Sequence, residues 1–557
     1  MKWKWPHSLA GRRRNGMLLA GICSLPLLGM STCDTPDLYV PMQDGTLLHT
    51  QVFETGKRAT PTVVTRTPQL LEGWESLGKS FNDHGYNLLA QSVRGAGDSA
   101  GVFDLYRADG WSSLQDGLST LSWADAQEWS SDAYCAVGGG EAGSLAYLLA
   151  GSGSESLQCL YVQFGSPDLY DLLWSGGALH MEVLDYMKRF LPNSGWETAI
   201  ASQYDPSRNW EGLRLQDQVE DLSAPMYMLS GWYDVANAPT LRLFEALQTG
   251  GNLGPGGNPP SHRLVIGPWS RFVPGPTIGE LTYPSNATIS SDEQWLWLDR
   301  WLKGARNGID TEAPVLYYRM GDPSETSTEW NVWLSSDVWP VPSTPLPFYL
   351  SSDGGLSLQP QLSNNAPRTY RYDPNNLIAT RGGANLLQYV GPMDQASIEK
   401  RDDVLVYSSE VFQEPLAITG EVIVKLWVST SARDTDFVVR LTDVYPDGRS
   451  MLVSDQLQRL RFRDGPAKEA LAEPGQIYPL TLSLGYTSQV FNKGHQVRIS
   501  VSSSNYPRFD YNRNDGAPLE TPGEGIPAEQ AVYSNTEFPS MVLLPKVPLS
   551  TANAGRQ

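Results

Sequence analysis

The stretch Tyr134–Leu149, YCAVGGGEAGSLAYLL, joins an apolar strand-like run to a helical run through three successive glycines. A strand that passes into a helix at a glycine cluster is typical of an α/β unit. Because strands and helical runs also alternate on both sides of this stretch, we predict a mainly parallel sheet covered by helices on both faces. The flanking segments are the strand-like runs Val63–Val64, Tyr86–Ala90, Leu160–Phe164, Met226–Leu229 and Leu264–Ile266 and the helical run Leu114–Trp129.

Composition limits the classes of protein to which the chain can belong. Its 557 residues suggest about three domains, and 18 Trp and 25 Tyr supply enough aromatic mass for sizeable cores, which excludes wholesale disorder. The net charge of -20 argues against nucleic acid as a partner, because binding to polyanions rests on cationic side chains. The six His are not clustered at ligand spacing, so we expect no metal centre of His residues.

The pattern changes twice along the chain. Residues 37–165 and 223–338 carry the α/β alternation, whereas residues 166–222 are rich in Trp, Tyr, Leu and Met at helical spacing and are predicted to form an inserted helical cap. The Pro-rich segment 339–347 is predicted to be a linker. Beyond it, residues 348–549 consist of short alternating runs separated by turn signals, which predicts an all-β sandwich of jelly-roll type.

Residues 1–33 have the pattern of an export signal. A basic start, with Lys2, Lys4 and Arg12–Arg14, precedes the apolar run Met17–Met30, which is too short to span a bilayer. We therefore expect a secreted or periplasmic protein without a transmembrane segment after signal removal. Cys33 is a candidate site for a lipid anchor, but lipoprotein signals have Leu and Gly or Ala where this chain has Met30 and Thr32, so plain secretion fits better.

Four cysteines are too few, and too irregularly spaced, for a disulfide scaffold or a Cys-based zinc site. Cys23 and Cys33 belong to the predicted signal. Cys135 and Cys159 both lie in apolar, strand-like runs. We therefore expect these two to be buried free thiols.

Several short motifs follow one another in a fixed order. Most of them are polar or glycine-rich turns at the ends of predicted strands, where α/β folds place their chemistry. They are Pro41–Gly45, Val93–Gly101, Gly231–Asp234 and Gly267–Ser270 in the α/β part, and Arg401–Leu405, Asp434–Phe437, Asp443–Gly448 and Val501–Pro507 in the β part.

Together these motifs resemble the cocaine esterase and Xaa-Pro dipeptidyl-peptidase family of α/β-hydrolases, over about residues 37–545. The resemblance implies an α/β-hydrolase domain, a helical cap and a C-terminal jelly roll. It implies hydrolysis of esters or amides by a Ser-His-Asp triad, and no metal or organic cofactor. The oligomeric state does not follow from it.

The residues at the family's catalytic positions depart from this pattern. The nucleophile position after the strand is Gly140, which has no side chain to attack a carbonyl. The position of the triad His, after Gly-Pro-Trp-Ser, is Arg271, which stays protonated and cannot act as a base. Gln69 stands at the position of the oxyanion-hole Tyr, and only the triad acid is retained, as Asp234.

Losing one triad member in a serine hydrolase costs as much as about 10⁶ in turnover, so three losses together predict a catalytically inactive homologue. Because a buried carboxylate needs a partner, we predict that Asp234 forms an ion pair with Arg271. Glu141 has two interpretations, a solvated pocket residue or a second partner of Arg271.

Two functions remain open from the sequence. In the first, the chain has lost hydrolysis and binds a small acyl- or peptide-like ligand or serves as a binding or scaffold subunit. In the second, it is an active ester or amide hydrolase with a rearranged site in which Ser144 is the nucleophile. A serine one turn into a helix, without an assigned His, is more often structural, as is Ser270 beside Arg271.

Overall fold

The computed structural model describes residues 35–549 except residues 112, 192–199, 201–203, 206, 208–209, 251–260, 272–274, 363 and 520–522. The predicted export signal, with Cys33, and the export expectation that rests on it therefore lie outside the described residues. The described residues from Pro36 onward belong to one compact unit. No helix among the described residues is long and apolar enough to cross a membrane.

The N-terminal part of the chain is built around a ten-stranded mixed sheet. Its inner strands, from β4 to β13 in sheet order, are parallel, and antiparallel strands close both edges. The central strand β9 is buried at every residue, as expected for a parallel strand covered on both faces. In sheet order, the strands are β1 (Leu38–Pro41), β2 (Leu47–Phe53), β4 (Asn87–Ser92), β3 (Thr60–Thr67), β5 (Ser130–Gly139), β6 (Leu157–Gln163), β9 (Met226–Tyr233), β10 (Arg263–Ser270), β13 (Val315–Arg319) and β14 (Val332–Ser336).

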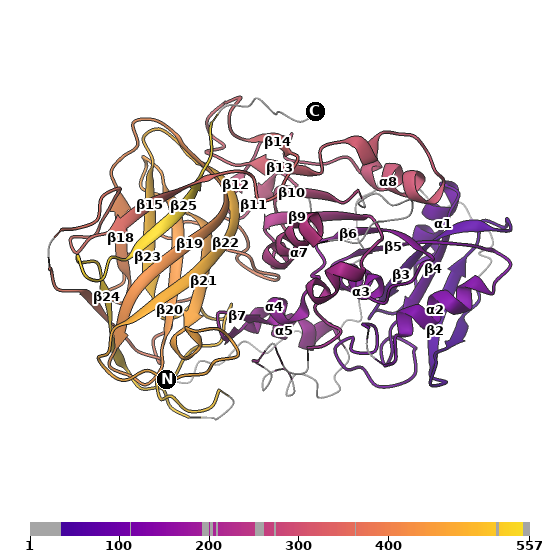
Figure 1. Ribbon diagram of the computed structural model, residues 1–557, viewed down its shortest axis with the longest axis horizontal. Helices are drawn as coiled ribbons and strands as arrows, with labels where there is room; N and C mark the ends of the chain where they lie inside the picture. Colours follow the sequence, from indigo (N-terminus) through magenta and orange to yellow (C-terminus); the bar gives the residue numbers. More distant parts are fainter. Residues whose placement is uncertain are drawn as a thin grey trace, which may run out of the picture. The chain divides into compact units, whose positions relative to one another are not determined.

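Helices cover both faces of this sheet (Figure 1). The rings of Phe81 and Trp295 lie 5.3 Å apart, so α1 and α8 are neighbours, while α3 packs on β5 and β6. The helices are α1 (Glu75–Asp83), α2 (Asp116–Asp125), α3 (Glu141–Ala150), α7 (Asn237–Gly250) and α8 (Asp292–Leu302), with the 3-10 turn η2 (Ile309–Thr311) and the small hairpin β11 (Thr277–Ile278) and β12 (Leu281–Thr282).

The cap region lies between β6 and β9 in the chain. Its described elements are α4 (Leu169–Leu173), the hairpin of β7 (Trp174–Ser175) and β8 (Ala178–Leu179), α5 (Met181–Phe190) and the 3-10 helix η1 (Leu215–Asp221). Glu182 in the first turn of α5 accepts backbone N–H groups of Leu386, Leu387 and Gln388. The cap is thereby tied to the C-terminal half of the chain.

The C-terminal half is an all-β sandwich with its own apolar core (Figure 1, orange and yellow). The predicted fold class, an α/β-hydrolase domain followed by an all-β domain, is confirmed. The strands are β15 (Thr344–Leu350), β16 (Gly355–Ser357), β17 (Arg368–Tyr372), β18 (Leu405–Ser409), β19 (Leu416–Thr430), β20 (Asp436–Val444), β21 (Ser450–Arg459), β22 (Tyr478–Phe491), β23 (Gln496–Ser502), β24 (Ala528–Tyr533) and β25 (Met541–Lys546), with the 3-10 turn η3 (Leu460–Phe462).

Part of the Pro-rich segment 339–347 is not a linker, contrary to the prediction. Residues from Thr344 onward belong to β15, which pairs with β25. Proline is tolerated here because Pro345 lies opposite Pro545, so two residues that lack an N–H face each other in the ladder.

The prediction of two buried free thiols is wrong in one respect. Cys135 of β5 and Cys159 of β6 are both buried, but they form a disulfide, with their Cα atoms 4.6 Å apart. They occupy paired positions of adjacent parallel strands. Strand register, rather than spacing along the chain, brings them within bonding distance.

Candidate active site

Gly140 alone connects β5 to α3, at the carboxyl edge of the parallel strands. Its φ of 59° and ψ of −121° lie in a region that only glycine enters without strain. Gly138 permits the close return of the chain, because a Cβ there would lie 2.3 Å from the backbone carbon of Ala142. The sharp strand-to-helix turn of a nucleophile elbow is therefore present, but its tip carries no side chain.

Asp234 follows β9 at the same edge and is 2% exposed. Its carboxylate accepts hydrogen bonds from the backbone N–H of Ala236 at 3.2 Å and from Ser230 Oγ at 3.1 Å. Burial raises the pKa of Asp234, and the positive charge of Arg271 opposes that rise. The retained acid is thus a buried carboxylate held by neutral donors.

Arg271 is the first residue after β10, and its side chain is 4% exposed. A Cβ built on Gly140 would lie 2.9 Å from Nη2 of Arg271. The guanidinium therefore occupies the space next to the missing nucleophile. It also lies 6.0 Å from the ring centroid of Tyr186 in α5.

The carboxylate at contact distance from Arg271 is Glu141, not the predicted Asp234. Glu141 Oε1 lies 3.5 Å from Arg271 Nη2, and no ion pair of 4.0 Å or less joins Arg271 to Asp234 among the described residues. Asp234 interacts with Arg271 through longer-range electrostatics. Of the two interpretations of Glu141, the structure supports that of a partner of Arg271. The reason is positional, since Glu141 is adjacent to the elbow and opens α3.

Two tyrosines near this cluster were not identified from the sequence. The hydroxyl of Tyr106 is buried without a hydrogen-bond partner among the described residues. Burial, and next the charge of Glu141, raise the pKa of Tyr106 well above its usual value. Burial also raises the pKa of Tyr186, with Glu141 contributing. No local motif marks either residue, because both reach the cluster from distant segments.

Gln69 does not take over the role of an oxyanion-hole tyrosine. Its side chain is exposed, its backbone N–H donates to Thr67 Oγ1 at 3.2 Å, and its carbonyl accepts from Ser92 Oγ at 2.7 Å. The other expected donor, the backbone N–H of Glu141, keeps its place at the N-terminus of α3. A backbone donor is therefore present at the position expected for one half of an oxyanion hole.

Ser144 is 3% exposed and is engaged by backbone groups on both sides. Its Oγ accepts from the N–H of Ser166 at 2.9 Å and donates to the carbonyl of Gly140 at 3.4 Å. No described histidine forms a hydrogen bond with Ser144: the ring of His180 contacts Leu172 and Phe509, and that of His495 contacts Asp443 and Asp322. The structure thus gives Ser144 a structural role, and Ser270 remains half-buried at the end of β10.

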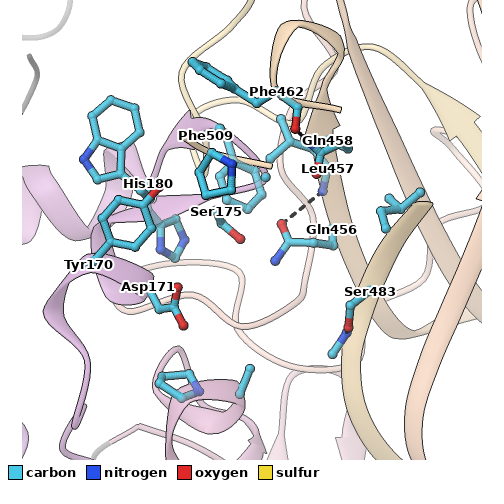
Figure 2. Close-up of a pocket in the computed structure, with 18 of the residues that line it drawn as sticks. Tyr170, Asp171, Ser175, His180, Gln456, Leu457, Gln458, Phe462, Ser483 and Phe509 are labelled. Carbon is cyan, nitrogen blue, oxygen red and sulfur yellow. Dashed lines mark hydrogen bonds between the residues drawn. The ribbon is translucent and has the colours of Figure 1, made fainter. Parts of the chain in front are cut away.

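A cavity of about 480 Å³ lies between the cap, α7 and strands of the sandwich (Figure 2). Its walls combine aromatic side chains with polar ones, and Asp171 and Arg242 form an ion pair in its lining. Burial lowers the pKa of His180 to about 3, so its ring is neutral. Gly140, Asp234 and Arg271 are not among the lining residues, which include Tyr170, Ser175, His180, Gln456, Phe462, Ser483 and Phe509.

Both halves of the chain match models of one protein family. Residues 44–190 and 181–271 match the X-Pro dipeptidyl-peptidase model of family S15, and residues 307–543 match the X-Pro dipeptidyl-peptidase C-terminal non-catalytic domain. The chain belongs to the S15 and cocaine esterase family. This confirms the resemblance seen in the sequence motifs. The family consists of serine hydrolases that act on esters and peptides.

Individual family members align over nearly the whole chain. The cocaine esterase of Rhodococcus sp. (strain MB1 Bresler) is 29% identical over 583 residues, which cover 91% of this chain and 98% of that protein. An aminopeptidase from a marine sediment Thaumarchaeota archaeon has the same fold, with a TM-score of 0.80, 21% identity and coverage of 95% of this chain and 99% of the other. An α-amino acid ester hydrolase gives a TM-score of 0.79, with 22% identity and coverage of 94% and 98%.

Proposed function

We propose that this chain is an exported, non-hydrolytic member of the S15 and cocaine esterase family that binds a small acyl- or peptide-like ligand. The observation that carries the proposal is the pairing of Gly140 with Arg271. The elbow has no nucleophile, and a guanidinium lies 2.9 Å from where a Cβ would project.

The chemistry of the two positions supports the loss of covalent catalysis. A serine hydrolase needs an oxygen that attacks the carbonyl carbon and an imidazole that takes its proton. Glycine offers no oxygen, and an arginine guanidinium already carries its proton and has no acceptor nitrogen for another. Asp234 would normally orient the imidazole, so its retention restores neither function.

The alternative of a rearranged site around Ser144 has less support. A nucleophile must reach solvent and substrate, whereas Ser144 is buried and hydrogen-bonded to Ser166 and Gly140. Its activation would also require a base, and Arg271 and Glu141 are engaged with each other.

Turnover by the purified protein separates the two functions. We expect a p-nitrophenyl ester and an X-Pro p-nitroanilide to be hydrolysed no faster than in buffer alone. The variant Ser144→Ala is the matched control. Turnover above background that disappears in Ser144→Ala would establish the rearranged site, and turnover that survives it would equally overturn the loss of hydrolysis.

The ligand-binding part of the proposal is supported by the cavity of about 480 Å³ in Figure 2. This volume lies in the range of small-molecule sites, and its aromatic and polar walls suit an acyl or peptide group. Calorimetric titration with an N-acyl dipeptide should show binding that Ser175→Trp, which fills the cavity, removes. Binding unchanged by Ser175→Trp would exclude this cavity as the site.

Export is supported by the buried disulfide between Cys135 and Cys159, because structural disulfides persist in oxidising compartments. Cell fractionation followed by intact-mass analysis should find a secreted or periplasmic chain shortened at its N-terminus. A mass increment on Cys33 would reveal a lipid anchor, and an intact N-terminus in the cytoplasm would contradict export.

A further inference from the structure

Three side chains with metal-binding atoms meet far from the Gly140 elbow. Asp322 and Glu325 lie in the loop after β13, and His495 lies in the turn between β22 and β23. One donor atom from each lies within 4.8 Å of the other two. Asp322 and His495 are buried, whereas Glu325 is exposed, so the cluster is closed on one side and open to solvent on the other.

Neighbouring groups orient these three side chains toward one another. Asp443 of β20, itself 1% exposed, places Oδ1 2.8 Å from His495 Nδ1, which leaves Nε2 facing the cluster. The backbone N–H and Oγ of Ser324 both donate to Asp322 Oδ1 at 2.8 Å, which leaves Oδ2 for the cluster. A carboxylate behind an imidazole is the usual second layer of a metal-binding histidine.

The Glu325 side chain is also held in place. Asn492 donates from Nδ2 to Glu325 Oε2 at 2.7 Å, and its Oδ1 accepts from the N–H of Asp322 at 3.3 Å. Asn492 therefore ties the Glu325 carboxylate to the backbone of Asp322, which fixes the position of this exposed glutamate.

The separation of His495 and Asp322 fits a shared ion better than a direct hydrogen bond. His495 Nε2 lies 3.6 Å from Asp322 Oδ2. An N–H···O hydrogen bond would be about 2.7–3.2 Å. Two ligands bound at about 2.0–2.2 Å to a tetrahedral zinc ion are about 3.3–3.6 Å apart.

The negative charge of the surrounding side chains also favours a bound cation. Three carboxylates, those of Asp322, Glu325 and Asp443, converge on one imidazole. The guanidinium of Arg449 interacts electrostatically with Asp322, but it is already paired with Asp447 at 2.8 Å. Even a protonated ring would leave an excess of negative charge, which a divalent cation balances.

We propose that Asp322, Glu325 and His495 bind one divalent transition-metal ion, with Zn²⁺ the ion that suits one imidazole and two carboxylates. Water completes the coordination on the exposed side of Glu325. The ion would join the sandwich to the loop that connects β13 and β14, the hairpin at the edge of the α/β sheet. These parts already touch through Met320, whose N–H donates to Ser488 O at 3.0 Å and whose carbonyl accepts from Val490 at 2.8 Å. The site is therefore structural and independent of hydrolysis.

The test is calorimetric titration of the EDTA-treated full chain with ZnCl₂, together with a thermal melt. We expect one Zn²⁺ per chain and a higher Tm with the ion. Glu325→Gln should weaken binding at least about tenfold and remove the Tm increase, while the apo protein folds normally because Glu325 is exposed. Glu537→Gln, at another exposed glutamate, is the matched control and should bind as wild type.

Several results would overturn the proposal. They are the absence of stoichiometric binding, equal binding by Glu325→Gln and Glu537→Gln, and anomalous scattering that locates the ion on other residues. Preference for Ca²⁺ over Zn²⁺ at equal concentration would contradict the assigned class of ion. A failure of these tests leaves the loss of hydrolysis untouched, since no residue of the Gly140 cluster takes part.

Discussion

The edge of the α/β sheet that carries Gly140 and Asp234 (the catalytic edge) and the sandwich interior both bury charged side chains, but they pair them differently. In the sandwich, Arg459 donates from Nε and Nη2 to the two oxygens of Asp436, at 2.9 and 3.0 Å. At the catalytic edge, Arg271 lies 3.5 Å from a single oxygen of Glu141, and Asp234 is held only by neutral donors.

This difference shows which part of the molecule depends on its charges for stability. The bidentate pair of the sandwich is a structural element whose members need each other. At the edge, the sharp strand-to-helix turn at Gly140 forms although only one oxygen of Glu141 contacts Arg271, so the backbone there does not depend on a bidentate ion pair.

The largest effect is expected in the sandwich. Asp436→Asn should lower the free energy of unfolding by about 3–5 kcal/mol, because the buried Arg459 loses its bidentate carboxylate and keeps only the contact of Nη1 with Asp510 at 3.0 Å. Guanidinium denaturation followed by circular dichroism measures the loss. Glu128→Gln, which removes the exposed partner of Arg58, is the control and should change little. If the two variants lose equal free energy of unfolding, the buried ion pair does not stabilise the protein more than the exposed one.

An intermediate effect is expected at the elbow. Gly140→Ser should destabilise the protein by about 1–3 kcal/mol, because a side chain at φ 59° is strained and its Cβ would lie 2.9 Å from Arg271. Gly139→Ser is the matched control, since the nearest atom to a Cβ there is 3.7 Å away and the backbone is ordinary.

The double variant Gly140→Ser with Arg271→His sharpens this prediction. Removing the guanidinium should recover part of the lost stability, leaving only the backbone strain. If the single and double variants unfold at the same denaturant concentration, a steric clash between the guanidinium and the side chain at position 140 does not contribute to the loss of stability.

The sequence predicted the architecture because local patterns carry it. The apolar run before Gly138, the turn motif ending at Asp234 and the one before Arg271 all lie at ends of parallel strands, as expected. The partners of these residues were harder to predict. The disulfide of Cys135 depends on the register of β5 and β6, and the contact of Arg271 with Glu141 depends on where side chains point.

The smallest effect concerns the pH dependence at Asp234. Burial raises the pKa of Asp234 in the folded state above its unfolded value near 3.9, so the folded state binds the proton more tightly. The stability that this proton contributes is present at low pH and is lost as pH rises through the folded pKa. Asp234→Asn carries no such charge.

Urea denaturation of Asp234→Asn and wild type between pH 4 and pH 7 measures this difference. The stability of the variant relative to wild type should increase as pH rises. A difference that is constant with pH would mean that Asp234 is ionised at no cost, contrary to this account.

Labelling by a fluorophosphonate tests the loss of the nucleophile most directly. Intact-mass analysis of the purified chain after prolonged exposure should show no adduct, because Gly140 has no hydroxyl and Ser144 is buried and hydrogen-bonded. A stoichiometric adduct on any serine, mapped by peptide mass, would contradict the account.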